Sequence, residues 1–185
     1  MKTWLATLLF ACATLAQAEV WHVGLIGDVP YADDERRELP YLLESMARQG
    51  VDFIAHIGDF KHGKDRCDDA LFADRYQLFN ASRVPFVFTP GDNEWMDCGR
   101  LSNGGYDPLE RLDKLRRLFW VDNFSLGQKK LPLERQPGAY REHARFVSAR
   151  CSSSPLTCPA AITISVRPIS PSRNLSPATR PYSPG

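Results

Sequence analysis

Short apolar runs alternate with longer stretches of helical spacing along residues 20–120. The apolar runs cover residues 20–26, 51–57 and 84–89 and predict three buried strands. Between the first two runs, four apolar side chains recur at intervals of three and four, which predicts a helix over residues 34–49: Leu39, Leu42, Leu43 and Met46. Pro40 argues against an uninterrupted helix, so its firm part is expected to begin near this proline.

Two further helices are predicted after the second and third strands. One covers residues 68–80 and turns Leu71, Phe72, Leu78 and Phe79 inward. The other begins at Asp107 and Pro108, an N-cap residue followed by a proline at the first helical position. Its expected apolar stripe consists of Leu109, Leu112, Leu115, Leu118 and Phe119.

Strands that alternate with helices in this way predict an α/β fold with a parallel sheet. Each predicted strand is followed by glycine and aspartate, which places Asp28, Asp59 and Asp92 at 31- and 33-residue intervals. Each interval fits one right-handed crossover, so all three aspartates are expected at one edge of the sheet. Open α/β sheets bind their ligands at this edge.

Three carboxylates at one edge would repel one another unless a positive charge lay between them. A divalent metal ion is the simplest such charge, and oxygen ligands suit Mn, Fe, Zn or Mg. The alternative is that glycine and aspartate end each strand only because both residues favour turns. The threefold recurrence at crossover spacing favours the metal site.

Composition limits the remaining choices. The 185 residues are 43% hydrophobic, enough for one buried core. The 23 basic and 22 acidic residues nearly cancel, so no global field would draw the chain to nucleic acid or to an anionic membrane. We therefore expect one domain and no nucleic-acid partner.

The first 18 residues have the pattern of a secretory signal peptide. A lysine precedes an apolar stretch that is too short to span a bilayer, and Ala16-Gln17-Ala18 forms a small-x-small cleavage site. Cleavage after Ala18 would export the chain to the periplasm or medium, without a membrane anchor. Export permits disulfides, and Cys67 and Cys98 follow the second and third aspartate motifs. A Cys67–Cys98 bridge and two unpaired thiols both remain open, because sequence does not give connectivity.

The three motifs GDVPY, GDFKH and PGDNEW, taken in this order, resemble the N-terminal motifs of the calcineurin-like metallophosphoesterases, which include the purple acid phosphatases. The resemblance covers residues 20–125. It implies an α/β/β/α sandwich, two divalent metal ions (Mn, Fe or Zn) and hydrolysis of a phosphate-ester substrate by metal-activated water.

The resemblance also implies roles for particular residues. Asp28 would ligate the first metal ion, Asp59 would bridge both ions, and Asp92 would ligate the second. Asn93 falls where the family has a catalytic histidine, and its amide can donate a hydrogen bond but cannot act as a general acid. His62 lies where the second motif has a tyrosine or aspartate, and it is either a metal ligand or a loop histidine.

Four neighbouring features have simpler interpretations. His56 lies within a predicted strand and is expected to be buried and hydrogen-bonded rather than a ligand. Lys61 is expected to be a solvated loop lysine. Glu94 is expected to hold a donor of the site in place. Residues 103–106 are expected to form a loop beside the site.

The pattern changes after residue 148. Residues 149–185 contain no aspartate or glutamate but seven of the fourteen prolines and eight serines, a composition that favours disorder. The two C-terminal histidine motifs of the family are absent, since the last histidine is His143. We therefore expect three segments: a signal peptide over 1–18, an incomplete phosphoesterase domain over 19–148 and an aberrant tail over 149–185. The tail would be the result of a truncation or frameshift. The alternative is a natural proline-rich tail.

Two functions follow from these observations. The first is a metal-dependent phosphoesterase. The second is a truncated, catalytically inert fragment that at most binds metal or phosphate. A truncated chain would be expected to expose apolar sheet surface and to bind metal poorly.

Overall fold

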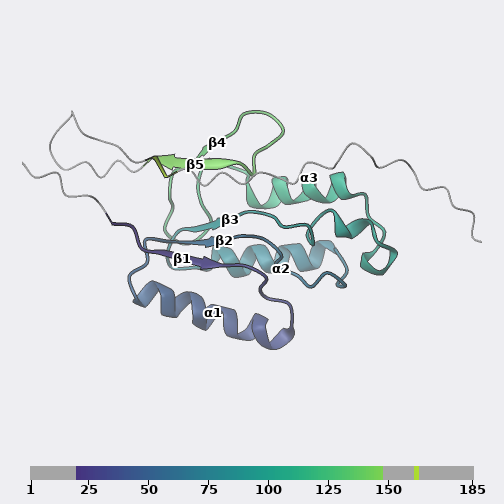
Figure 1. Cartoon of the computed structure of the whole chain (residues 1–185), viewed down its shortest axis with the longest axis horizontal. Coiled ribbons are helices and arrows are strands. Elements are labelled where there is room, and N and C mark those ends of the chain that lie inside the picture. The colour runs from purple at the N-terminus through teal and green to yellow at the C-terminus, as the bar shows by residue number, and fades with distance from the viewer. Residues whose placement is uncertain (1–19, 148–160, 163–185) are drawn as a thin grey trace, which may run out of the picture.

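The computed structural model of the chain describes residues 20–147 and 161–162 (Figure 1). The predicted signal peptide lies outside the described residues. So does the predicted tail, except for the pair Ala161–Ile162, which forms the short strand β6. None of the helices in the described part of the chain has the length and apolar character needed to cross a membrane.

Three strands alternate with three helices in the order expected from the sequence. The strands are β1 (Val23–Ile26), β2 (Phe53–His56) and β3 (Phe86–Phe88), and the helices are α1 (Asp33–Arg48), α2 (Asp69–Asn80) and α3 (Pro108–Phe119). The strands pair in parallel in the order β1-β2-β3. The predicted α/β class with a parallel sheet is therefore confirmed.

Helix α1 runs through Pro40 without interruption, so the expected break there is wrong. The proline removes one backbone hydrogen bond, but it lies on the exposed side of the helix, where water can reach the freed carbonyl. On the side that faces the sheet, Leu39 and Leu43 are buried. Their burial outweighs the preference of proline against helix interiors.

Helix α3 begins as predicted. The Asp107 carboxylate accepts hydrogen bonds from the backbone nitrogens of Leu109 (2.7 Å) and Glu110 (3.3 Å), and Pro108 is the first helical residue. Leu109 itself is 67% exposed, so its assignment to the apolar stripe is wrong. It lies in the first turn, and the buried stripe begins one turn later with Leu112.

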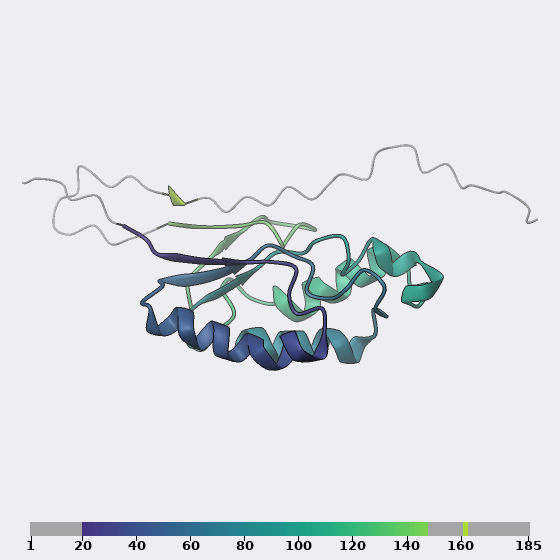
Figure 2. The same ribbon diagram turned by 60° about the horizontal axis from the view of Figure 1, so that its bottom comes forward.

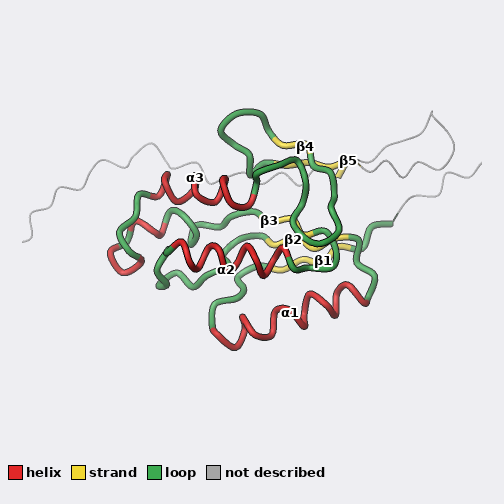
Figure 3. The backbone as a smooth tube through the Cα atoms, turned by 180° about the vertical axis from the view of Figure 1, so that it is seen from behind, coloured by secondary structure: helices red, strands yellow, loops and turns green. Residues whose placement is uncertain are grey.

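The helices and a second, smaller sheet cover opposite faces of the parallel sheet (Figure 2). On the helical face, side chains of all three helices share one core with Ile54, Phe86 and Phe88. Figure 3, which shows the molecule from behind, has α2 on the near side of the strands and α1 below them. The layers of the described residues are therefore helix, sheet and sheet; a second helical layer of the expected sandwich is not among them.

The second sheet is antiparallel and consists of β4 (Glu134–Arg135), β5 (Ala144–Val147) and β6. Phe146 of β5 packs on Phe53 of β2, with ring centroids 5.2 Å apart, and Trp21 packs on both rings. This contact closes a second core between the sheets.

Coverage of the parallel sheet is incomplete at β1. Val23 and Leu25 are 43% and 64% exposed, and Ile57, just after β2, is 56% exposed. The register places Val23 beside Phe53 and Leu25 beside Ala55, so both belong to the face that the second sheet covers further along. Apolar surface of the parallel sheet is therefore exposed at its β1 edge.

His56 is a core residue, as predicted. It is fully buried and its ring lies among Phe79, Phe86 and Phe88. Its Nε2 lies 2.7 Å from the carbonyl oxygen of Val29, and its Nδ1 accepts a hydrogen bond from Gly58 N (3.1 Å). Burial lowers the pKa of His56 to about 4, so the ring is neutral in the folded protein at physiological pH.

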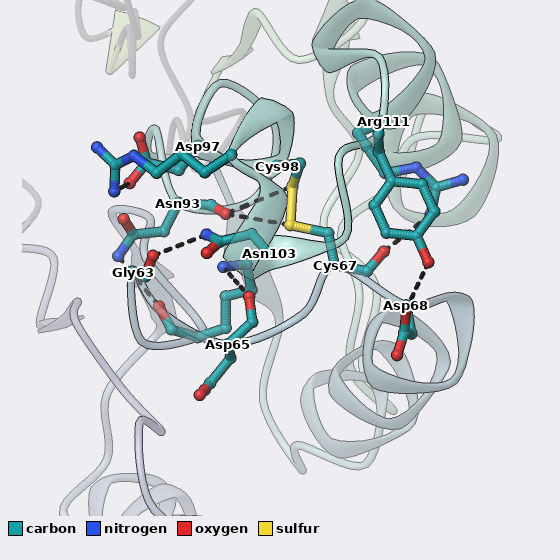
Figure 4. Close-up of a disulfide and its surroundings, with 12 residues drawn as sticks. Gly63, Asp65, Cys67, Asp68, Asn93, Asp97, Cys98, Asn103 and Arg111 are labelled. Carbon is teal, nitrogen blue, oxygen red and sulfur yellow. Dashed lines mark hydrogen bonds and ion pairs between the residues drawn. A yellow bond between two sulfur atoms is a disulfide. The ribbon is translucent and has the colours of Figure 1, made fainter. Parts of the chain in front are cut away.

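A disulfide joins the loops that follow β2 and β3 (Figure 4). Cys67 and Cys98 are bonded across 31 residues, which answers the question that the sequence left open. Asn103 supports the same junction, because its side chain donates to Gly63 O (2.7 Å) and its carbonyl accepts from Cys67 N (2.9 Å). Arg111 of α3 donates to Cys67 O (2.9 Å). The two loops that carry Asp59 and Asp92 are therefore held together covalently.

The disulfide is expected to stabilise the fold mainly by restricting the unfolded chain. Replacing both cysteines with alanine should lower the free energy of unfolding by about 4 kcal/mol, as loop-closure entropy predicts for a loop of this length. Urea denaturation of the double variant and of the wild type measures the difference. Wild-type protein under reducing conditions is the control and should behave like the variant; equal midpoints for oxidised wild type and variant would contradict the assignment.

His56 should make the fold sensitive to acid. Because its folded pKa of about 4 lies below the value of 6.5 for a free imidazole, its contribution to stability is complete above pH ~6.5 and is lost as the pH falls toward ~4. We expect a loss of about 3 kcal/mol across this window. Denaturation of wild type and of His56→Gln, each compared with its own stability at neutral pH, tests this. A variant that loses as much stability as the wild type would show that another group is responsible.

Candidate metal centre

The three aspartates of the repeated motif all follow the carboxyl ends of parallel strands. Asp28 comes after β1, Asp59 after β2 and Asp92 after β3. The first two loops are joined directly, because Asp28 N donates a hydrogen bond to Gly58 O (3.0 Å). The sheet therefore brings the three loops to one edge, as the spacing predicts.

Asp28 and Asp59 have left-handed backbone conformations, with φ of 58° and 59°. This region is unfavourable for residues with a side chain, although aspartate and asparagine tolerate it better than most. Two such residues at equivalent strand ends indicate a local geometry that the surrounding structure maintains. The turn at each of these two strand ends is thus made by the aspartate itself as well as by the glycine before it.

The glycines at these strand ends have a further role in allowing the loops to touch. A Cβ atom at Gly58 would lie 2.3 Å from Gly91 N, and one at Gly91 would lie 2.0 Å from Oδ1 of Asp59. Any larger residue at either position would separate the second loop from the third. The repeated glycine therefore permits close contact between neighbouring loops.

Asp59 lies at the centre of the acidic edge. Its Oδ1 accepts a hydrogen bond from Asn93 N (3.1 Å), and its carboxyl group is hydrogen-bonded to that of Asp92. The pKa of Asp59 is raised, first by burial and then by the charges of Asp92 and Asp28, against the opposing effect of the Asn93 N–H. A cation at this edge would relieve the repulsion among the three carboxylates.

Asp28 is held by Tyr31, a residue that the sequence analysis missed. The Tyr31 hydroxyl donates to Oδ1 of Asp28 (2.8 Å). Burial, this hydrogen bond and the charge of Asp59 all raise the pKa of Tyr31, so the phenol stays protonated. The only signal in the sequence was the position of a tyrosine three residues after the aspartate in GDVPY.

Glu94 fastens the second loop to the third. The side chain is fully buried, and its two oxygens accept backbone hydrogen bonds from Gly91 N (2.9 Å) and Phe60 N. Burial raises the pKa of Glu94 to about 8. The expectation that Glu94 holds part of the site in place is therefore confirmed, and what it holds is main chain on both sides of the acidic edge.

Asn93, the predicted catalytic residue, directs its side chain into the second loop. Its Nδ2 donates to Lys61 O (3.1 Å), and the residue is buried. The Asn93 amide, which was expected to donate to the substrate, therefore donates to the main chain. The backbone N–H of Asn93, rather than its side chain, contacts the acidic edge through Asp59.

Lys61 is fully buried, so the expectation of a solvated loop lysine is wrong. Its Nζ donates to His62 O (3.1 Å) and Asp65 O (3.0 Å), which compensates the ammonium group for the loss of water. Burial lowers the pKa of Lys61, while the charges of Glu94 and Asp65 oppose this shift. The lysine supports the loop from inside and is not exposed to a ligand.

His62 lies at the rim of the site. The side chain is exposed, and its ring meets the edge of the Tyr31 ring with centroids 5.5 Å apart. Its Nδ1 accepts a hydrogen bond from Lys64 N (3.1 Å). His62 is therefore separated from Asp28 by one tyrosine and does not join the three aspartates directly.

The side chains, as they stand, do not form a complete metal site. Among the described residues, no three His, Cys, Asp or Glu groups are placed to hold a metal ion together. The donor set nevertheless fits a hard or borderline divalent cation, because the paired carboxyls of Asp59 and Asp92 and the carboxyl of Asp28 lie at one edge and raise the pKa of Asp59.

Comparison with known proteins agrees with this arrangement. Neither the curated proteins nor the solved structures gave a match. The family model for calcineurin-like phosphoesterases matches residues 21–149, which include all three aspartate motifs and both sheets as far as β5. The chain therefore belongs to the calcineurin-like phosphoesterase family.

Proposed function

We propose that this chain is a metal-dependent phosphoesterase that hydrolyses a phosphate ester. The observation that supports this most directly is the meeting of Asp28, Asp59 and Asp92 at the carboxyl edge of the parallel sheet, where Asp59 and Asp92 are already hydrogen-bonded. Members of this family typically use two divalent metal ions. We propose Mn, Fe or Zn, because these ions accept carboxylate together with imidazole or amide ligands.

Asp28, Asp59 and Asp92 would hold the ions, with Asp59 between them. When bound, divalent cations supply activation of water and neutralisation of the phosphoryl oxygens. The chain itself positions the three carboxylates. Tyr31 orients Asp28 through its hydroxyl, and Glu94 fixes the separation of the loops that carry Asp59 and Asp92. His62, which the sequence offered as a possible ligand, lies at the rim of this edge beside Tyr31.

A second candidate is a catalytically inert fragment that at most binds metal or phosphate. It is favoured by one observation: within the described residues, no group of three potential ligands is assembled. Two of the four histidines also do not belong to the site. His56 lies in the core, and His143 is hydrogen-bonded to Gln136, outside the three aspartate motifs. The two candidates differ in metal stoichiometry and in turnover.

We also propose that the chain is exported and cleaved after Ala18. The Cys67–Cys98 disulfide supports this, because such bonds persist in oxidising compartments. Once the signal peptide is removed, the chain would work in the periplasm or medium.

Metal content and turnover should depend on Asp59. The wild type should bind about two divalent ions per chain and hydrolyse an aryl phosphate ester, by the two-metal mechanism. Asp59→Asn keeps a residue that tolerates the left-handed backbone but removes the charge, so it should lose metal and turnover. Asp113→Asn, an exposed aspartate of α3 paired with Arg117, is the matched control and should keep both.

Elemental analysis after dialysis and a phosphate-release assay give the two measurements. Equal metal content in the two variants would refute the assignment of Asp59. Weak or single-ion binding by the wild type without turnover would support the inert fragment instead.

Export has a direct test in the mass of the recovered chain. Protein isolated from the exported fraction of its native host should begin at Glu19, because the small residues at positions 16 and 18 define the cleavage site. An intact Met1 on the mature chain would contradict both cleavage and the assignment of residues 1–18.

A further inference from the structure

A phosphate group at an acidic edge requires hydrogen-bond donors in addition to cations. Three donors near the aspartates are already engaged. The Tyr31 hydroxyl donates to Asp28, the Asn93 amide donates to Lys61 O, and the Lys61 ammonium is buried against two carbonyl oxygens. Each of these bonds is one that the fold uses, and the Asn93 and Lys61 side chains, which carry further N–H protons, are buried.

His62 is the neighbouring residue with a donor to spare. Its Nδ1 accepts a hydrogen bond from Lys64 N, and a backbone N–H can only donate. A neutral ring with Nδ1 as acceptor carries its proton on Nε2. No residue in the described part of the chain accepts a hydrogen bond from this Nε2, and the side chain is exposed.

The loop around His62 fixes the direction of the ring. His62 N donates to the Asp65 carboxylate (3.2 Å), and Asp65 N donates back to His62 O (2.9 Å). The buried Lys61 Nζ donates to the same His62 carbonyl and to Asp65 O. The Tyr31 ring then supports the imidazole on the side of Asp28. The ring is thus oriented before any ligand binds, which reduces the entropic cost of contact.

These contacts argue against a direct bond from His62 to a metal ion. An imidazole that binds a cation through Nε2 carries its remaining proton on Nδ1, where it usually donates to a carbonyl or carboxylate. Here Nδ1 faces the N–H of Lys64, so a metal on Nε2 would place two donors against each other.

We propose that His62 binds a phosphoryl oxygen of the substrate through Nε2–H and is not a metal ligand. This role rests on the proposed phosphoesterase function. In it, His62 provides the hydrogen-bond donor that the sequence led us to expect from the Asn93 amide. The histidine would occupy the rim beside Tyr31, so a phosphate group held at the three aspartates would extend toward it.

The test compares metal-loaded wild type with His62→Ala, His62→Gln and the control His22→Ala. His22 is an exposed histidine before β1 and away from the acidic edge. Inorganic phosphate is the probe, its affinity is measured by calorimetry, and bound metal is measured by elemental analysis. His62→Ala should weaken phosphate binding about tenfold, the usual effect of losing a hydrogen bond to a charged group. His62→Gln, whose amide can donate, should recover part of the affinity, and all four proteins should hold the same metal.

Each alternative outcome has a distinct meaning. Loss of metal from His62→Ala would make His62 a ligand and overturn the proposal. Unchanged phosphate affinity in His62→Ala would also overturn it while leaving the metal centre in place. A wild type that binds neither metal nor phosphate would remove the proposed function, and the donor role with it. Nitrogen-15 NMR of the metal-free chain offers an independent check, because a neutral His62 protonated on Nδ1 would overturn the proposal whether or not metal binds.

Discussion

Parallel pairing of β1, β2 and β3 is the constraint on which the rest of the structure depends. In a parallel sheet all carboxyl ends lie at one edge, so residues about thirty positions apart in the chain become neighbours in space. That pairing brings Asp28, Asp59 and Asp92 close enough for the pKa of Asp59 to be raised by the other two. Without it, the repeated Gly-Asp would be three unrelated turns.

Buried polar groups hold the loops of this edge in place. Glu94 accepts backbone hydrogen bonds from two loops, Lys61 donates to two carbonyls of one loop, and Asn93 links the same loops through its amide. Each group loses its hydration when it is buried, and each recovers hydrogen bonds from main chain that would otherwise be unsatisfied. The disulfide adds a covalent link to the same pair of loops. Lys61, Asn93 and Glu94 thus act as scaffold, and the aspartates and the exposed His62 are the parts of the second and third motifs left for a ligand.

The incomplete covering of β1 and the incomplete ligand set are related features of the described residues. The second sheet covers Phe53 of β2, but Val23 and Leu25 of β1 stay exposed. On the side of the site, three carboxylates converge but no imidazole joins them within the described part of the chain. Because no imidazole joins the carboxylates among the described residues, metal content is a direct measure of how complete the site is.

The sequence by itself determined the elements, their class and the convergence of the aspartates. Periodicity located the three parallel strands and the three helices, because it depends on local pattern. The crossover spacing placed three carboxylates at one edge, because βαβ units have a fixed handedness. It could not determine which way side chains face. Lys61 appeared solvated and proved buried, Asn93 appeared catalytic and proved bound to main chain, and Tyr31 passed unnoticed until its hydroxyl was seen on Asp28. Pro40 and Leu109 were misjudged for the same reason, since burial on one side of a helix depends on what the helix packs against. Only the tertiary structure decided these points, because each depends on contacts between residues far apart in the chain.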